Sequence, residues 1–176
     1  ATPVLGSAAI QGALAHAGIA PDQVDEVLMG CVLPAGLGQA PARQASLGAG
    51  IPASAGCTTV NKVCGSGMKT IMLGYDAIKA GSAKVVVAGG MESMTNAPHL
   101  LNGSRTGVRY GSAEFLDHMA LDGLTNPYDG QAMGVFGDMA CRKYDFDRAA
   151  LDAFSAESAT RAQSAIGEGR FRDEVV

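Results

Sequence analysis

The sequence has no tryptophan, and aromatic residues make up only 5% of its 176 residues. Charge is also sparse: 17% of the residues are Asp, Glu, Lys or Arg, and the net charge is −4. A nucleic-acid-binding surface needs a basic patch, so this composition argues against a nucleic-acid partner. Hydrophobic residues amount to 47%, which excludes a disordered chain, and 176 residues are enough for one domain with a substantial core.

Two further features are missing from the sequence. No apolar run approaches the roughly 20 residues that span a membrane, and the first residues lack the order of a signal peptide. The four cysteines lie far apart without a CxxC pair, which favours free thiols over disulfides or a zinc site: Cys31, Cys57, Cys64 and Cys141. We therefore expect a cytoplasmic protein with no membrane anchor and no metal.

Strand and helix patterns alternate along the chain. Short apolar runs predict strands over residues 24–33, 58–63 and 84–88, and the helix after the second run is expected over residues 68–80. Further helices are expected over residues 113–121, 133–143 and 147–167. This alternation predicts an α/β fold in which helices are layered on a sheet.

Both ends of the sequence lie close to expected secondary structure. The first element is already a helix, and residues 171–176 read as the opening of a strand. We therefore expect that both ends are truncated.

Cys64 is the candidate nucleophile. It stands in the sequence Cys-Gly-Ser-Gly between a predicted strand and a predicted helix, so its thiol is expected at the start of that helix. The partial positive charge and free N–H groups there stabilise a thiolate. The alternative is that Cys64 is a small buried hydrophobic residue, as is expected of the other three cysteines.

A resemblance to the active-site block of the thiolases is carried by the stretch VNKVCGSGMKTIMLGYDAIKAGSAKVVVAGGMESMTNAP. Other family segments are similar, in the same order, to GQAPARQASLGAGIP, GSAEFLDHMALDGLT and FSAESATRAQSAIGEGRFRDEVV. The resemblance implies a thiolase-like layered α/β/α fold with a mixed, five-stranded type of sheet. It implies that this chain is the N-terminal half and lacks the first strand of that sheet. It implies a core with the nucleophile over residues 1–93 and the beginning of a loop domain over residues 94–176.

The resemblance also implies site residues. Cys64 matches the cysteine that accepts an acyl group from an acyl-CoA thioester, and its N–H matches one donor of an oxyanion hole. Asn61 and Ser66 are expected to hold the loop around it. Leu124 and Met133 match apolar contacts to the pantetheine arm of CoA, which is the cosubstrate; no further cofactor is implied.

The same resemblance implies acetyl-CoA acetyltransferase activity and a homo-oligomer, a tetramer joined through residues 94–110. Arg105 and Arg109 lie in this segment, although solvated surface charge is the plainer interpretation of both. Ala132 departs from the family, which often has His there, and this leaves the acyl preference open. The helix after Cys64 is expected to be buried against a second, similar half.

The family's activating His, Asn-held water and second Cys have no counterpart here, so the 176-residue chain alone is expected to be inactive. His16, His99 and His118 are assigned ordinary surface or structural roles. Four alternatives stay open: a longer-chain 3-ketoacyl-CoA thiolase, a ketoacyl synthase, a non-catalytic lipid carrier or scaffold, and a cysteine hydrolase. The last is the weakest, since no His and Asn partners are evident.

Overall fold

A computed structural model describes residues 1–176, which divide into two compact units, Ala1–Leu124 and Thr125–Val176. The boundary predicted between residues 93 and 94 falls inside the first unit. As the boundary between the core and the loop domain, it stays a prediction. No helix is long and apolar enough to cross a membrane.

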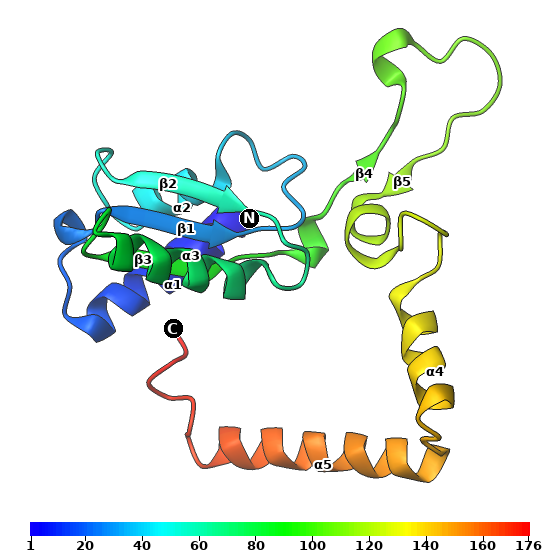
Figure 1. Ribbon diagram of the computed structural model, residues 1–176. Helices are drawn as coiled ribbons and strands as arrows, with labels where there is room; N and C mark the ends of the chain where they lie inside the picture. The colour runs from blue at the N-terminus through cyan, green and yellow to red at the C-terminus, as the bar shows by residue number, and fades with distance from the viewer. The chain divides into compact units, whose positions relative to one another are not determined.

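A three-stranded parallel sheet forms the centre of the first unit (Figure 1). Its order is β2-β1-β3, with β1 at Glu26–Gly30, β2 at Gly56–Val60 and β3 at Val86–Gly90. The strands are in register, so Gly30 lies opposite both Val60 and Gly90 and all three strands end at one edge. The expected strands are confirmed with shifted limits, but no strand in this sheet is antiparallel, so the expectation of a mixed sheet is wrong.

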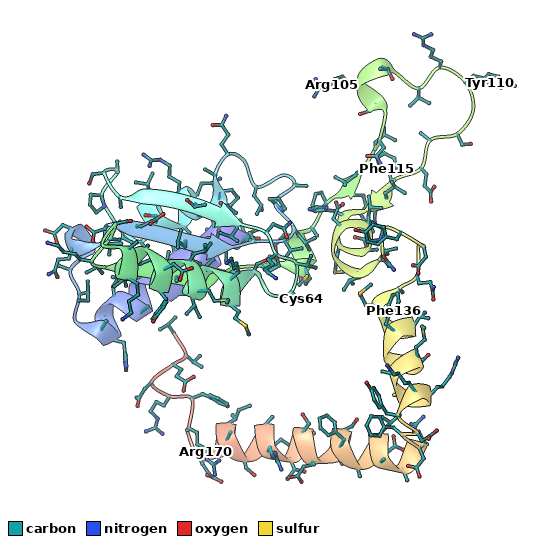
Figure 2. The ribbon with its side chains drawn as sticks, in the orientation of Figure 1. Cys64, Arg105, Tyr110, Phe115, Phe136 and Arg170 are labelled. Atoms are coloured by element: carbon teal, nitrogen blue, oxygen red, sulfur yellow. The ribbon has the colours of Figure 1, made fainter.

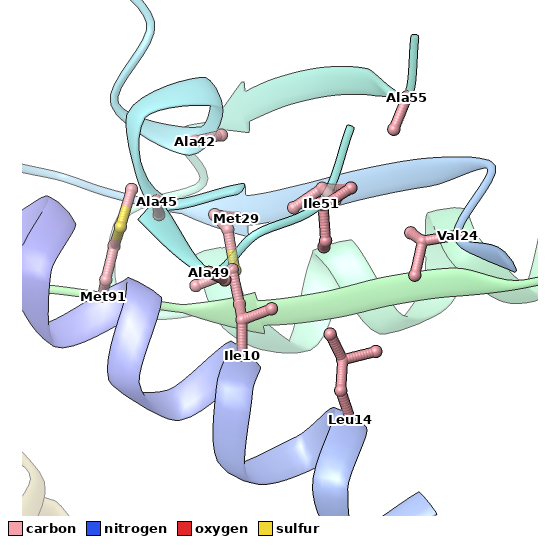
Figure 3. Close-up of a cluster of buried hydrophobic side chains, with 11 residues drawn as sticks. Ile10, Leu14, Val24, Met29, Ala42, Ala45, Ala49, Ile51, Ala55 and Met91 are labelled. Atoms are coloured by element: carbon pink, nitrogen blue, oxygen red, sulfur yellow. The ribbon is translucent and has the colours of Figure 1, made fainter. Parts of the chain in front are cut away.

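Helices cover both faces of the sheet, which confirms the layered α/β/α architecture. Helices α1 (Thr2–Ala17) and α2 (Pro41–Gly48) pack together and share a hydrophobic core with Val27 and Met29 of β1 (Figure 3). Alternate strand residues point to the opposite face. There α3, Ser66–Ala80, lies against the sheet, and a Cβ added at Gly74 would meet the Cγ1 of Val86 at 3.2 Å.

Helix α3 buries its small side chains and exposes its large ones. Its buried residues are Ser66, Thr70 and Gly74, spaced four apart and facing the sheet. The opposite face is exposed and consists of Met68, Ile71, Met72, Tyr75 and Ile78. Within this chain the helix is therefore only half buried. It lies so close to the sheet that only small side chains fit between the two.

An extended arm of the first unit begins and ends at two short strands, β4 (His99–Leu100) and β5 (Leu116–Asp117), which pair antiparallel. The helix expected over residues 113–121 is wrong in its first half, because Leu116 and Asp117 hydrogen-bond across to β4. A π-helix follows at Ala120–Leu124. The long loop between β4 and β5 carries Arg105 and Tyr110 at its far end (Figure 2).

The second unit contains α4, Met133–Lys143, and α5, Arg148–Gly167, as expected. The Asp147 carboxylate caps α5 by accepting a 2.7 Å hydrogen bond from the Ala150 N–H. Residues 171–176 form a turn rather than a strand, because the N–H groups of Glu174 and Val175 both donate locally to the Phe171 carbonyl.

Two leucines of α1 test the placement of the core. Leu14 is 7% exposed and Leu5 is 55% exposed on the same helix. Leu14→Ala should lower the free energy of unfolding by about 2–4 kcal/mol through lost burial and a residual cavity, and Leu5→Ala by less than about 0.5 kcal/mol. Urea denaturation measures both; equal losses would contradict the assignment of this core.

Candidate active site

Cys64 lies on a tight turn that links β2 to α3, and it is the exposed cysteine among the four free thiols (Figure 2). Helix α3 begins at Ser66 with Gly65 as its N-cap, so Cys64 stands two residues before the first helical residue. The sequence placed the thiol at the helix start itself. The turn instead places the thiol before the helix, at the edge of the sheet.

The backbone of this turn is strained just before Cys64. Val63 has φ of 47°, in the left-handed region that a β-branched residue rarely occupies. Such a conformation costs on the order of 1–3 kcal/mol and persists only where surrounding contacts impose it. The strain lies next to the residue that is expected to react.

Asn61 and Ser66 supply those contacts. The Asn61 Oδ1 accepts a 2.9 Å hydrogen bond from the Val63 N–H. The Ser66 hydroxyl donates to the Val63 carbonyl at 2.6 Å and accepts from the Lys62 N–H at 2.8 Å. The two side chains thus hold the loop, as predicted from the sequence.

Glycines allow the turn and α3 to sit directly on the edge of the sheet. A Cβ added at Gly30 would lie 2.7 Å from the Ser66 carbonyl carbon and 2.8 Å from the Gly67 nitrogen. A Cβ at Gly90 would lie 3.4 Å from the Gly67 Cα. The ends of β1 and β3 therefore approach the backbone of α3 where any side chain would push it away.

A pocket of about 440 Å³ opens at this edge, beyond the carboxyl ends of the three parallel strands. That edge is the usual ligand position in open α/β sheets. Four segments line the pocket: Gly30, Val32 and Leu33 after β1; Val63, Cys64, Ser66 and Gly67 at the turn; Gly90, Met91, Glu92 and Met94 after β3; and Met119, Gly123 and Leu124. The lining is mostly apolar, with the thiol exposed in it.

Sequence reasoning found part of this lining. Leu124 lines the pocket, although its contact with pantetheine stays a prediction. Met133 is the first residue of α4 in the second unit, and its role also stays a prediction. Glu92 and Met119 were not singled out; the Gly-Gly-Met-Glu sequence directly after a parallel strand would have pointed to Glu92, because strand ends of this kind form the ligand edge.

Glu92 ties the loop after β1 to the loop after β3. Its carboxylate accepts hydrogen bonds from the Val32 N–H at 2.6 Å and the Leu33 N–H at 3.2 Å. The buried Cys31 thiol lies 3.5 Å from the same carboxylate. Burial raises the pKa of Cys31 to about 11, and the negative charge of Glu92 adds to the rise. Cys31 is therefore inert at neutral pH, which agrees with its expected structural role.

The chain that carries this site is similar to known proteins. The family model of the thiolase N-terminal domain matches residues 2–176. An acetyl-CoA acetyltransferase of Schizosaccharomyces pombe is 51% identical over 172 residues, covering 98% of this chain and 44% of the relative. One from Cupriavidus necator is 48% identical over 174 residues, covering 99% and 44%. The chain thus spans less than half the length of the curated relatives it matches.

Because Cys64 is exposed and Cys31 is buried, we expect the two thiols to react with alkylating reagents at different rates. At pH 8 a thiol with a pKa of about 11 is thiolate in only about one molecule in a thousand, and burial also shields Cys31 from reagents. Iodoacetamide should therefore alkylate Cys64 at least about 100 times faster than Cys31. Peptide mass spectrometry measures both rates, and in urea they should converge. Comparable rates in the folded protein would contradict the described site.

Proposed function

The chain belongs to the thiolase family as its N-terminal domain, and on this basis we propose that the protein transfers acetyl groups between coenzyme A thioesters, with Cys64 as the acyl carrier. The observation that carries the proposal is the exposed thiol of Cys64 on a strained, hydrogen-bonded turn that opens onto a pocket. The names of the relatives, acetyl-CoA acetyltransferase, support acetyl as the acyl group.

The proposed reaction has two steps. The Cys64 thiolate attacks the thioester carbonyl of a first acetyl-CoA, the C–S bond to CoA breaks, and CoA leaves as a thiolate that takes up a proton. A second acetyl-CoA loses a proton from its methyl group, and the resulting carbanion attacks the acetyl-cysteine. Acetoacetyl-CoA then forms and the Cys64 thiolate is released; thiolysis is the reverse.

The residues of this chain have limited roles in these steps. The backbone N–H of Cys64 donates to the developing oxyanion, which such a fixed donor stabilises more than the neutral carbonyl. The turn held by Asn61 and Ser66 fixes the sulfur in place before the substrate arrives. The apolar lining of the pocket, which includes Leu124, suits the acetyl group and the pantetheine arm. Met133, in the second unit, stays a predicted contact of the pantetheine arm.

The bases that activate Cys64 and the second substrate are proposed to come from a second, similar domain. The exposed apolar face of α3 is the surface that it would cover, since five large side chains there are exposed in this chain. More than half of each relative's length lies outside the match, which leaves room for such a domain. We expect this chain alone to be inactive.

Cytoplasmic location is part of the proposal. It is supported by four free thiols and by the printed name of a relative from Gibberella zeae, 46% identical over 171 residues, which describes that protein as cytosolic. The second candidate activity is a longer-chain 3-ketoacyl-CoA thiolase. Ala132, where the family often has His, is the residue that favours considering it.

Steady-state assays of the full-length protein test the proposal. Cys64→Ala should abolish both condensation of acetyl-CoA and thiolysis of acetoacetyl-CoA, a loss of at least about 10³-fold for removal of a covalent nucleophile. Cys57→Ala is the matched control and should retain activity. Faster thiolysis of long 3-ketoacyl-CoA than of acetoacetyl-CoA would favour the second candidate. A folded wild type inactive on both would leave the carrier or scaffold alternative.

We also propose that residues 94–110 join dimers into a tetramer. The arm between β4 and β5 exposes Val108, Tyr110 and Phe115, an apolar set that a soluble monomer rarely displays on a projecting loop. Replacing residues 103–112 by two glycines should convert tetramers to dimers in analytical ultracentrifugation while thiolysis persists. A shortened protein that stays tetrameric would contradict this role of the arm.

A further inference from the structure

His118 is a buried imidazole that the proposed chemistry does not use. It is 4% exposed and lies between β5 and the π-helix at Ala120–Leu124. Its Nδ1 lies 2.6 Å from the Asp122 Oδ2, and its Nε2 accepts a long hydrogen bond, 3.4 Å, from the Ala35 N–H. Its own backbone N–H donates to the Pro98 carbonyl at 3.1 Å. Three separate segments therefore meet at this residue.

These partners assign the tautomer of the ring. Because Nε2 accepts from the backbone N–H of Ala35, it carries a lone pair, and the ring proton resides on Nδ1. The Nδ1–H then donates to the Asp122 carboxylate at 2.6 Å, a short hydrogen bond to a charged acceptor. The ring is thus held in one orientation from both of its nitrogens.

The fixed ring connects two walls of the pocket that contains Cys64. The His118–Asp122 pair bridges the start of the π-helix, and the neighbouring residues Met119, Gly123 and Leu124 line one wall. Ala35 follows Val32 and Leu33, which line another. The two walls meet directly as well, since a Cβ at Gly123 would lie 3.6 Å from the Leu33 Cδ2.

We propose that His118 and Asp122 are positioning residues that hold the Met119–Leu124 wall against the loop at Ala35 and so set the affinity of the pocket for the acyl-CoA. This inference rests on the proposed function. The pair does not hold the nucleophile, because Asn61 and Ser66 fix the Cys64 turn through a separate set of hydrogen bonds. Displacing the pair therefore weakens substrate binding and leaves the acyl-transfer step intact.

Two substitutions of Asp122 separate its position from its charge in the full-length protein. Asp122→Asn keeps a carbonyl oxygen in place to accept from Nδ1–H and removes the charge. Asp122→Glu keeps the charge and moves it by one methylene. Asp122→Glu should raise KM for acetyl-CoA roughly fivefold, the scale of one weakened hydrogen bond, with kcat within about twofold. Asp122→Asn should keep KM within about twofold of wild type.

The matched control is Asp152→Glu. Asp152 pairs with Arg148 at the same i,i+4 spacing, but on an exposed helix of the second unit, and this change should leave KM unaltered. The rate at which iodoacetamide alkylates Cys64 should be the same in all variants. An unchanged KM in Asp122→Glu, a raised KM in Asp122→Asn, or a fall in kcat alone would overturn the inference. A wild type without transferase activity would instead contradict the proposed function.

Discussion

The closeness of α3 to the carboxyl ends of β1 and β3 is the constraint on which the site depends. Gly30, Gly67 and Gly90 meet there with backbone atoms in contact, and added Cβ atoms at Gly30 would lie within 3 Å of the α3 backbone. This contact fixes the first residues of α3 against the sheet. The chain between β2 and α3 must then turn within a few residues, and the left-handed Val63 and the exposed Cys64 result from that short connection.

The same constraint decides which side chains of α3 are buried. Only Ser66, Thr70 and Gly74 fit beneath a helix that lies so near the strands, and the Thr70 hydroxyl lies 2.7 Å from the Gly67 carbonyl and 2.9 Å from that of Gly89. The large apolar residues are left on the outer face. The helix that follows Cys64 is therefore also the surface at which a further domain is proposed to pack and to bring bases to the sulfur.

Much of this arrangement could be predicted from the sequence, because it depends on contacts between residues that are close together in the chain. The strand–Cys-Gly-Ser-Gly–helix order located the exposed Cys64 thiol, and Asp147 marked the beginning of α5 because its carboxylate caps the helix locally. The loop-holding role of Asn61 and Ser66 was also predictable, since both act on neighbours within five residues.

Features that depend on distant partners were missed. Leu116 and Asp117 were expected in a helix, but pairing with β4, about 17 residues earlier, makes them a strand. The parallel direction of all three strands likewise follows from packing and not from periodicity. His118 was assigned an ordinary role because its link to Ala35 joins residues 83 positions apart.

The central claim, that Cys64 carries the acyl group within this pocket, is tested most directly by mass spectrometry of the full-length protein quenched after mixing with acetyl-CoA alone. The account predicts one acetyl group, released by hydroxylamine as expected of a thioester, on the peptide that contains Cys64. Acetylation confined to another residue, or none in a protein that still forms acetoacetyl-CoA, would contradict it.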